Sequence, residues 1–274
     1  MLKRAIPSTD EYIPAIGLGT YRSFDVKFDQ NKKNLLNVIK LFYEAGGMVI
    51  DTSPMYGLAE STLGQVISSL NMNDIFFLAT KVWTKGKNNG YRQMQKSLQK
   101  LETKQLQLMQ VHNLIDCDTH LETLREWKEQ KKIKFIGITH YTDNKFDELS
   151  RYIKKNPDID FCQIPYSIAN RTAELYFLDL CSDFEIATLI NRPFEQKGLF
   201  RQVKQSTIPI WAKEFGCSTW AHYFLKYILA HNAVTCVIPA TNNPNHLAEN
   251  LMVGETRLPE KRELQKMVEY FESI

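Results

Sequence analysis

The chain has 274 residues, of which 43% are hydrophobic and 24% charged, and its formal net charge is +3. These values are typical of a globular protein and argue against disorder, a membrane span and nucleic-acid binding, which needs basic residues gathered on one face. The five cysteines form no CxxC pair, and their odd number argues against a disulfide framework. The charged start at residues 1–4 lacks the apolar stretch of a signal peptide. We expect a cytoplasmic protein, or an exported one if a leader has been removed.

Strand and helix patterns alternate along the whole chain. Short apolar runs predict strands at residues 13–20, 48–51, 75–81, 106–112, 133–138, 159–164, 185–190 and 234–238. Apolar residues at helical spacing predict helices near residues 32–45, 60–70, 91–101, 121–131, 144–154, 172–180, 208–215, 218–230, 245–251 and 259–273. An irregular segment is expected at residues 191–205.

Repeated strand and helix units with short connections predict an α/β fold of the (β/α)₈ (TIM) barrel type, with residues 1–274 forming a single domain. The alternative is a doubly wound open sheet, which would place Gly-x-Gly-x-x-Gly after the first strand. The segment that begins at Gly17 has Gly19 but lacks the third glycine. Asp51 does close the next strand as an acidic residue would in the open sheet, so this exclusion is weak.

Ionisable residues stand at the ends of three consecutive predicted strands. Asp51 and Tyr56 follow the second strand, Lys81 ends the third and His112 ends the fourth. Each has an ordinary explanation by itself: a helix cap with a tyrosine packed on it, a surface lysine, and a core histidine. Because the carboxyl ends of barrel strands meet at one rim, their conjunction favours a shared catalytic site.

The four side chains suit the reduction of a carbonyl group. A phenol normally titrates near pH 10, and a nearby ammonium such as that of Lys81 would lower the pKa of Tyr56 toward the working range. Asp51 would hold Lys81 charged and oriented, and His112 would hydrogen-bond the carbonyl oxygen. Tyr56 would then supply the proton after hydride transfer from a cofactor. A small-molecule aldehyde or ketone is the predicted substrate.

These residues resemble the aldo-keto reductase superfamily. Asp51–Gly57 is similar to its Asp/Tyr signature, Thr80 and Lys81 to its lysine strand, and residues 110–112 to its histidine strand. The resemblance spans roughly residues 13–250. It implies a (β/α)₈ barrel, an NAD(P)-dependent oxidoreductase without a metal, and a catalytic tetrad of Asp51, Tyr56, Lys81 and His112.

The resemblance also implies a set of cofactor-binding residues at the strand ends. These are Gly19, Thr20, Tyr21, Asp51, Thr139, His140, Gln163, Asn191, Arg192, Pro193, Phe194, Pro239, Ala240, Thr241, Asn242, His246, Glu249 and Asn250. Two of them depart from the family pattern. His140 replaces an amide, and Asn191 replaces the tyrosine that usually stacks on the nicotinamide. We expect the stacking surface to come from Phe194 or Tyr21, or to be absent, and Phe194 to pack plainly otherwise.

The family commonly binds the 2′-phosphate of NADP with basic residues, but Ala240, Asn242 and His246 stand at those positions. Guanidinium and ammonium groups are the usual partners of a phosphate. We still expect NADP(H), with His246 or Arg192 contributing, and keep NAD(H) as a possible cofactor.

The segment after the eighth unit is short, so we expect an open pocket that favours an apolar or aromatic carbonyl. Its predicted lining is Tyr21, Phe24, Tyr56, Trp83 and His112, with Phe200 as a further candidate. We expect a monomer or weak oligomer with no nucleic-acid or membrane partner.

Two other functions remain open from the sequence. An aldo-keto reductase-like chain can serve as a cofactor-binding regulatory or redox-sensing subunit with little turnover. A metal-dependent hydrolase is least favoured, because Asp51 and His112 lack the companion histidines of a zinc site.

Overall fold

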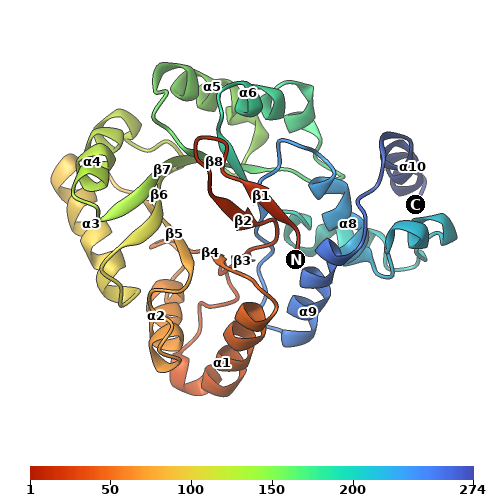
Figure 1. Ribbon diagram of the computed structural model, residues 1–274, viewed down its shortest axis with the longest axis horizontal. Helices are drawn as coiled ribbons and strands as arrows, with labels where there is room; N and C mark the ends of the chain where they lie inside the picture. The colour runs from red at the N-terminus through yellow and green to blue at the C-terminus, as the bar shows by residue number, and fades with distance from the viewer.

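The computed structural model describes residues 1–274, and a ring of parallel strands lies at its centre (Figure 1). In sheet order, the eight strands run from β10 through β9, β8, β7, β6, β5 and β4 to β3. Their bounds are β3 Leu18–Gly19, β4 Val49–Asp51, β5 Phe77–Val82, β6 Leu106–His112, β7 Ile133–Thr139, β8 Phe161–Pro165, β9 Ala187–Asn191 and β10 Cys236–Val237.

Backbone contacts between the two edge strands close the ring. Parallel bridges join Ile16 to Val237 and Gly19 to Ala240, and the Gly17 amide donates to the Val237 carbonyl at 2.8 Å. A Cβ atom on Gly19 would lie 2.7 Å from the Ile238 carbonyl oxygen, so glycine permits this close approach. The predicted (β/α)₈ barrel is confirmed.

Helices surround the ring, as Figure 1 shows. Helix α1 buries Leu35, Val38, Ile39 and Phe42 against the sheet. The helices are α1 Phe28–Glu44, α2 Ala59–Ser69, α3 Lys87–Lys100, α4 Cys117–Glu129, α5 Phe146–Lys155, α6 Phe177–Asp183, α7 Gly198–Gln202, α8 Trp220–Leu229, α9 Pro244–Met252 and α10 Lys261–Glu272. Short 3₁₀ segments are η1 Asp143–Lys145, η2 Thr172–Leu175, η3 Glu195–Lys197, η4 Ile210–Phe215 and η5 Val253–Glu255. None of the helices is long and apolar enough to cross a membrane.

A separate hydrophobic cluster fills the interior of the barrel. The rings of Phe77, Phe135 and Phe161 pack there with centroids 5.4 to 5.9 Å apart. Because alternate residues of a strand face the same side, the inward row of β5 continues from Phe77 to Lys81. The barrel interior is therefore apolar toward the amino ends of the strands, and the inward positions at their carboxyl ends carry polar side chains.

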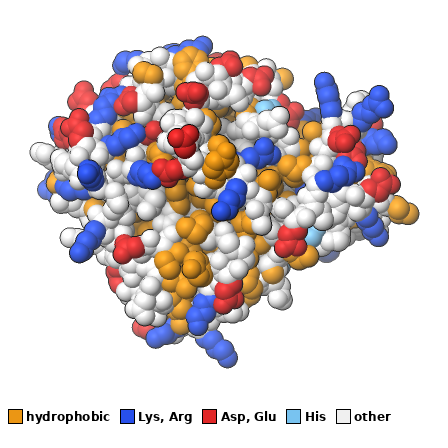
Figure 2. All heavy atoms as spheres, in the orientation of Figure 1, with side chains coloured by type: hydrophobic (Ala, Val, Ile, Leu, Met, Phe, Trp, Pro, Cys, Tyr) orange, Lys and Arg blue, Asp and Glu red, His pale blue; other side chains and the backbone are white.

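An antiparallel hairpin covers the opposite end of the barrel and lies in front of it in Figure 1. It pairs β1 Lys3–Ala5 with β2 Tyr12–Pro14, and its residues Ile6 and Ile13 join the interior cluster. The predicted strand at residues 13–20 is thus wrong as one continuous element, because its first part belongs to the hairpin. Basic and acidic side chains are interspersed over this face in Figure 2.

Two further predicted elements differ in detail. The helix expected at residues 172–180 is broken at Tyr176, whose φ of −165° and ψ of −24° separate η2 from α6. The segment 191–205, expected to be irregular, contains the short helix α7. Residues 195–197 before α7 all have positive φ, and this turn sets α7 apart from β9.

Candidate active site

A buried ion pair lies at the carboxyl ends of β4 and β5. The Lys81 Nζ atom is 2.8 and 2.7 Å from the two Asp51 carboxylate oxygens and 2.7 Å from the Thr52 carbonyl oxygen. Both residues are almost inaccessible, with Lys81 at 0% and Asp51 at 2% exposure. Burial lowers the pKa of Lys81, and the charge and hydrogen bonds of Asp51 oppose that shift. All three ammonium hydrogens thus have an acceptor, and the pair is held in one geometry.

Two amide side chains also hold the Asp51 carboxylate in place. Gln110 Nε2 and Gln163 Nε2 donate to Asp51 Oδ1 at 3.2 and 2.8 Å. The Thr139 hydroxyl donates to Gln163 Oε1 at 3.1 Å, so a continuous polar network joins β4 to β8. Gln110 was not among the predicted site residues. Its signal was a polar side chain in an apolar strand, two positions before His112 and therefore on the same face.

The Tyr56 ring lies between the ion pair and the rim. Its centroid is 5.3 Å from Lys81 Nζ, and it packs edge-on against Tyr21 at a centroid distance of 5.0 Å. The pKa of Tyr56 is raised by burial, then by the negative charge of Asp51, and the positive charge of Arg192 opposes this. The expectation that the pKa of Tyr56 is lowered toward the working range is therefore wrong, because burial and then the charge of Asp51 raise it. Tyr56 is a protonated phenol at neutral pH.

The His112 ring lies beside Tyr56, with ring centroids 6.3 Å apart. The Ser53 hydroxyl accepts from the Met55 amide at 3.2 Å and lies 3.3 Å from His112 Nδ1. We assign the Ser53 proton to that contact, which makes Nδ1 an acceptor and leaves the hydrogen on Nε2. Burial, followed by the charges of Lys81 and His140, lowers the pKa of His112 to about 3. His112 is thus a neutral hydrogen-bond donor.

Polar groups at the ends of β7 and β9 can hold a carboxamide. His140 Nδ1 accepts from the Thr142 amide at 3.2 Å, and burial lowers the pKa of His140, so its Nε2 carries a hydrogen to donate. Asn191 Oδ1 is buried without any hydrogen-bond partner, and Asn191 Nδ2 makes only a 3.4 Å contact with the His140 carbonyl. This orphaned acceptor, beside the donor of His140, fits the amide of a nicotinamide.

An aromatic surface that the sequence analysis did not identify follows β7. The Tyr141 ring stacks on His140 with centroids 5.3 Å apart and planes 11° apart, and the Arg192 guanidinium lies 4.6 Å from the Tyr141 centroid. Tyr141 is exposed. Its signal was an aromatic residue directly after His140 at a strand end. Phe194, a predicted stacking residue, packs instead against Phe200 at 4.9 Å.

The segment after β10 leads into the first turn of α9. Pro239 and Thr241 are buried and Ala240 is exposed. The Asn243 side chain caps α9 by accepting from the Asn245 amide at 2.9 Å. Pro244 has no N–H and the Asn245 amide is used by the cap, which leaves the His246 amide as the free donor of the first turn for a phosphate group. Further along α9, His246 is exposed, Glu249 is half-buried and Asn250 is buried.

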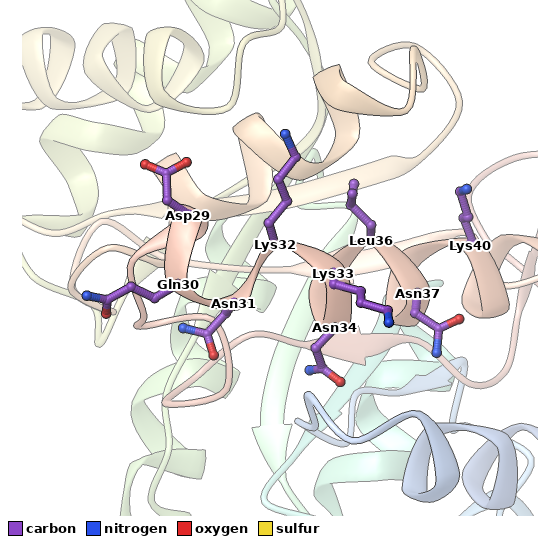
Figure 3. A pocket seen from close by; sticks show the side chains of 9 residues that line it. All are labelled: Asp29, Gln30, Asn31, Lys32, Lys33, Asn34, Leu36, Asn37 and Lys40. Carbon is purple, nitrogen blue, oxygen red and sulfur yellow. The ribbon is translucent and has the colours of Figure 1, made fainter.

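Helix α1 lies against this segment. Asn34 Nδ2 donates to the Asn242 carbonyl at 2.7 Å. Figure 3 shows a surface pocket beside α1, with Asn34 pointing toward the C-terminal segment drawn in blue. All nine lining residues belong to α1 and Leu36 alone is hydrophobic, so this pocket is separate from the site around Tyr56.

Most of the predicted substrate-binding residues lie at the rim. Trp83 is 37% exposed and packs against His112 at 6.5 Å between ring centroids, and Tyr21 is 42% exposed. The prediction that Phe24 lines the substrate pocket is wrong. The turn after β3 bonds its amide to the Thr20 carbonyl at 3.0 Å, and its ring is fully buried in the outer core. Phe200 is half-buried against Phe194.

Metal ions in proteins are usually held by clusters of His, Cys, Asp and Glu side chains. No group of three or more His, Cys, Asp and Glu side chains is placed to hold a metal ion. All five cysteines are free and buried.

The chain is similar to known proteins of one family. The model of the Aldo/keto reductase family matches residues 15–269. Methylglyoxal reductase YeaE of Escherichia coli is 26% identical over 92% of this chain and 89% of that protein. Aldo-keto reductase YhdN of Bacillus subtilis is 27% identical, but the match covers 64% of this chain and 56% of that protein.

Two other matches concern the nucleotide. The NADH-specific methylglyoxal reductase of E. coli is 26% identical over 76% of this chain and 72% of that protein. A crystal structure of an aldo-keto reductase from Klebsiella pneumoniae in complex with NADPH superposes with a TM-score of 0.82 at 23% identity, covering 99% of this chain and 96% of that one.

Proposed function

The chain belongs to the aldo/keto reductase family and is an NAD(P)-dependent oxidoreductase, and from this premise we propose that it reduces an aldehyde or ketone to an alcohol with Tyr56 as the proton donor. The observation that carries the proposal is the buried pair of Asp51 and Lys81 beneath Tyr56, with neutral His112 at the same rim. We propose that the whole chain acts as one domain.

The residues at the rim have separate tasks in this reaction. A nicotinamide held at this rim would supply hydride to the carbonyl carbon, and the carbonyl oxygen would then need a proton. Tyr56 holds that proton, since burial and Asp51 raise its pKa. His112 Nε2 donates a hydrogen bond that orients the carbonyl oxygen. As Tyr56 gives up its proton, the Lys81 ammonium 5.3 Å from its ring centroid stabilises the developing phenolate.

The ends of β7, β8 and β9 would hold the nicotinamide. Thr139, His140 and Gln163 offer donors and acceptors for the carboxamide, and Asn191 Oδ1 is an acceptor without a partner. The nicotinamide ring would be faced by Tyr21, because the family's tyrosine is replaced by Asn191 and the Tyr141 ring already packs against His140 and Arg192. The first turn of α9 would take the phosphates.

NADP(H) is the favoured cofactor in this proposal, in line with the NADPH complex of the Klebsiella protein. NAD(H) is the second candidate. Its support is the lack of a basic side chain at Ala240, Asn242 and His246, and one relative is named as NADH-specific.

The exposed rings of Tyr21 and Trp83 favour an apolar or aromatic carbonyl substrate over a small hydrophilic one. The test is to offer the protein a panel of aliphatic and aromatic aldehydes and to measure turnover of each as the loss of NADPH absorbance. Narrow selectivity for one small charged aldehyde would contradict this substrate class.

The proton donor is tested by Tyr56→Phe. We expect the turnover number to fall by about 10² to 10⁴, while calorimetry shows unchanged NADPH affinity. Tyr43→Phe on α1, an exposed tyrosine far from the rim, is the matched control. Full activity of Tyr56→Phe would remove Tyr56 as the donor. Dinucleotide binding without turnover of any carbonyl would favour a regulatory subunit instead.

A further inference from the structure

The loop after β5 carries Trp83 to the rim of the barrel. The Trp83 ring is 37% exposed, and its centroid lies 6.5 Å from that of the His112 ring. It is the most exposed of the four tryptophans, since Trp127 is fully buried and Trp211 and Trp220 are half-buried. A large aromatic ring beside His112 forms a wall for a carbonyl compound that His112 contacts.

One side chain of α3 holds the backbone of Trp83 by both of its polar groups. Gln93 Oε1 accepts from the Trp83 amide at 2.6 Å, and Gln93 Nε2 donates to the Trp83 carbonyl at 3.2 Å. A single amide thus binds Trp83 in the way that a residue of a neighbouring strand would. These bonds fix the backbone from which the indole projects, so the ring can move only about its own side-chain torsions.

Two side chains at the start of α4 hold the residues that follow Trp83. His120 Nε2 lies 2.7 Å from the Thr84 carbonyl oxygen, which can only accept, so Nε2 carries the hydrogen. Asp116 Oδ2 accepts from the Gly86 amide at 2.6 Å, and this bond lowers the pKa of Asp116, so its carboxylate stays charged at neutral pH. The loop is therefore bonded from α3 at Trp83 and from the start of α4 at Thr84 and Gly86.

We propose that Gln93 is a positioning residue that fixes the Trp83 ring as a rigid wall of the substrate pocket, and that it thereby sets the preference for aromatic over small aliphatic carbonyls. This inference rests on the proposed function, since it assumes a carbonyl substrate beside His112. Both hydrogen bonds of the Gln93 side chain go to Trp83, so Gln93 acts on the substrate only through that residue.

A fixed ring favours an aromatic substrate more than a small one. An aromatic substrate packs its face or edge on the indole, and a ring that is already held in place loses little conformational freedom when this happens. A mobile ring would have to be ordered at the moment of binding, at a cost of about two- to tenfold in affinity. A small aliphatic carbonyl covers little of the ring, so its binding should depend little on Gln93.

The experiment compares benzaldehyde with butanal in steady-state assays of the purified protein with saturating NADPH. Gln93→Leu keeps the approximate volume and removes both bonds to Trp83. Its Michaelis constant for benzaldehyde should rise by about two- to tenfold, while the turnover numbers and the Michaelis constant for butanal stay within about twofold. Gln95→Leu, an exposed position on the same helix, is the matched control and should change none of these values.

Two further measurements separate positioning from a general loss of structure. In a Trp83→Ala background the wall is absent, so Gln93→Leu should cause no additional rise in the Michaelis constant for benzaldehyde. The fluorescence anisotropy decay of the ligand-free protein, with that of the matching Trp83→Phe variant subtracted, should show faster nanosecond motion of the indole in Gln93→Leu. Circular dichroism and the unfolding midpoint of each variant exclude loss of folding as the cause.

Several results would overturn the role of Gln93. They are an unchanged Michaelis constant for benzaldehyde in Gln93→Leu, an equal rise for both aldehydes, or an additional rise in the Trp83→Ala background. Asp116→Gly releases the Gly86 amide and tolerates the left-handed backbone of that position, whose φ is 50°. A larger effect there than in Gln93→Leu would place control of the ring at the start of α4 and not at Gln93.

The outcome is separable from that of the proposed function. If the indole moves faster in Gln93→Leu but the wild type reduces no aldehyde, the positioning stands and the proposed reduction fails. If aldehydes are reduced and Gln93→Leu keeps both the preference and the anisotropy decay of the wild type, the positioning alone fails.

Discussion

The rim of the barrel has two halves that differ in how their charged side chains are paired. On the catalytic half, over β4 to β6, Lys81 and Asp51 are buried and every donor of the ammonium has an acceptor. On the cofactor half, over β7 to β10 and β3, the guanidiniums of Arg22 and Arg192 lie over tyrosine rings and form no ion pair. Buried polar atoms without a partner occur on both halves, Gln110 Oε1 on the first and Asn191 Oδ1 on the second.

This difference separates what the protein completes by itself from what a ligand completes. An ion pair completed before any ligand arrives keeps its geometry and loses no energy in rearranging during the reaction. We expect the unpaired groups of the cofactor half to gain partners when the dinucleotide binds. Substitutions on the catalytic half should therefore mainly change the free energy of unfolding. Substitutions on the cofactor half should mainly change the affinity for the dinucleotide.

The largest effect is expected from Lys81→Met on the catalytic half. It leaves the Asp51 carboxylate buried without its ion-pair partner, which should lower the free energy of unfolding by about 3 to 5 kcal/mol in urea titrations. Adding Asp51→Leu should recover at least half of that loss, because both charges are then gone. Lys87→Met is the control, since its pair with Glu126 is exposed, and it should change little. Equal losses at Lys81 and Lys87 would contradict a special role for the buried pair.

The next effect concerns Gln163, which joins the two halves by contacting both Asp51 and Thr139. Gln163→Leu keeps the volume but removes both hydrogen bonds, and the unfolding free energy should fall by about 1 to 3 kcal/mol. The exposed Gln95→Leu on α3 should stay within about 0.5 kcal/mol. A neutral Gln163 variant would show that the halves are energetically independent.

The pH dependence of stability should report on His112. Its pKa falls from an ordinary 6.5 to about 3 in the folded protein, so the unfolded chain binds a proton that the folded one does not. The unfolding free energy should therefore decrease as the pH falls below about 6.5, by up to about 1.4 kcal/mol per pH unit. Compared between pH 7 and pH 5, wild type should lose about 2 kcal/mol more than His112→Gln. Parallel pH profiles of the two proteins would refute this role.

The smallest effect on stability is expected on the cofactor half. Asn191→Ala removes an unpartnered oxygen and one 3.4 Å contact, so the ligand-free protein should change by less than about 0.5 kcal/mol. The rise in melting temperature on adding a fixed excess of NADPH should shrink, because a bound ligand stabilises by an amount that grows with the logarithm of its affinity. A large loss of stability without ligand would erase the contrast between the halves.

Much of this fold is readable from the sequence, because most barrel strands are apolar runs of five or more residues. Strand β6 has the predicted bounds, Leu106–His112. The failures occur where elements are short. Strand β3 has two residues, too few for a periodic pattern, and the apolar run through residue 13 concealed the hairpin before it.

The site was predictable in its positions but not in its electrostatics. Alternation along a strand and the alignment of strand ends are enough to place Lys81 and His112 at one rim. The pKa of Tyr56 is raised first by burial and then by the charge of Asp51, and spacing along the sequence reveals neither. Local turns are also hidden from the sequence. Phe24 was predicted to lie at the rim, but the turn after β3 directs its ring into the core.

The hairpin of β1 and β2 gives the barrel two ends with independent tasks. Ile6 and Ile13 seal the end opposite the rim and pack on the lower interior, which carries no reacting group. Substrate and cofactor must therefore enter and leave at the rim. The opposite end, covered by the hairpin, is available for attaching the protein to a support or a fusion partner. Immobilisation or fusion through the N-terminus would hold the protein by the side that takes no part in exchange with solution.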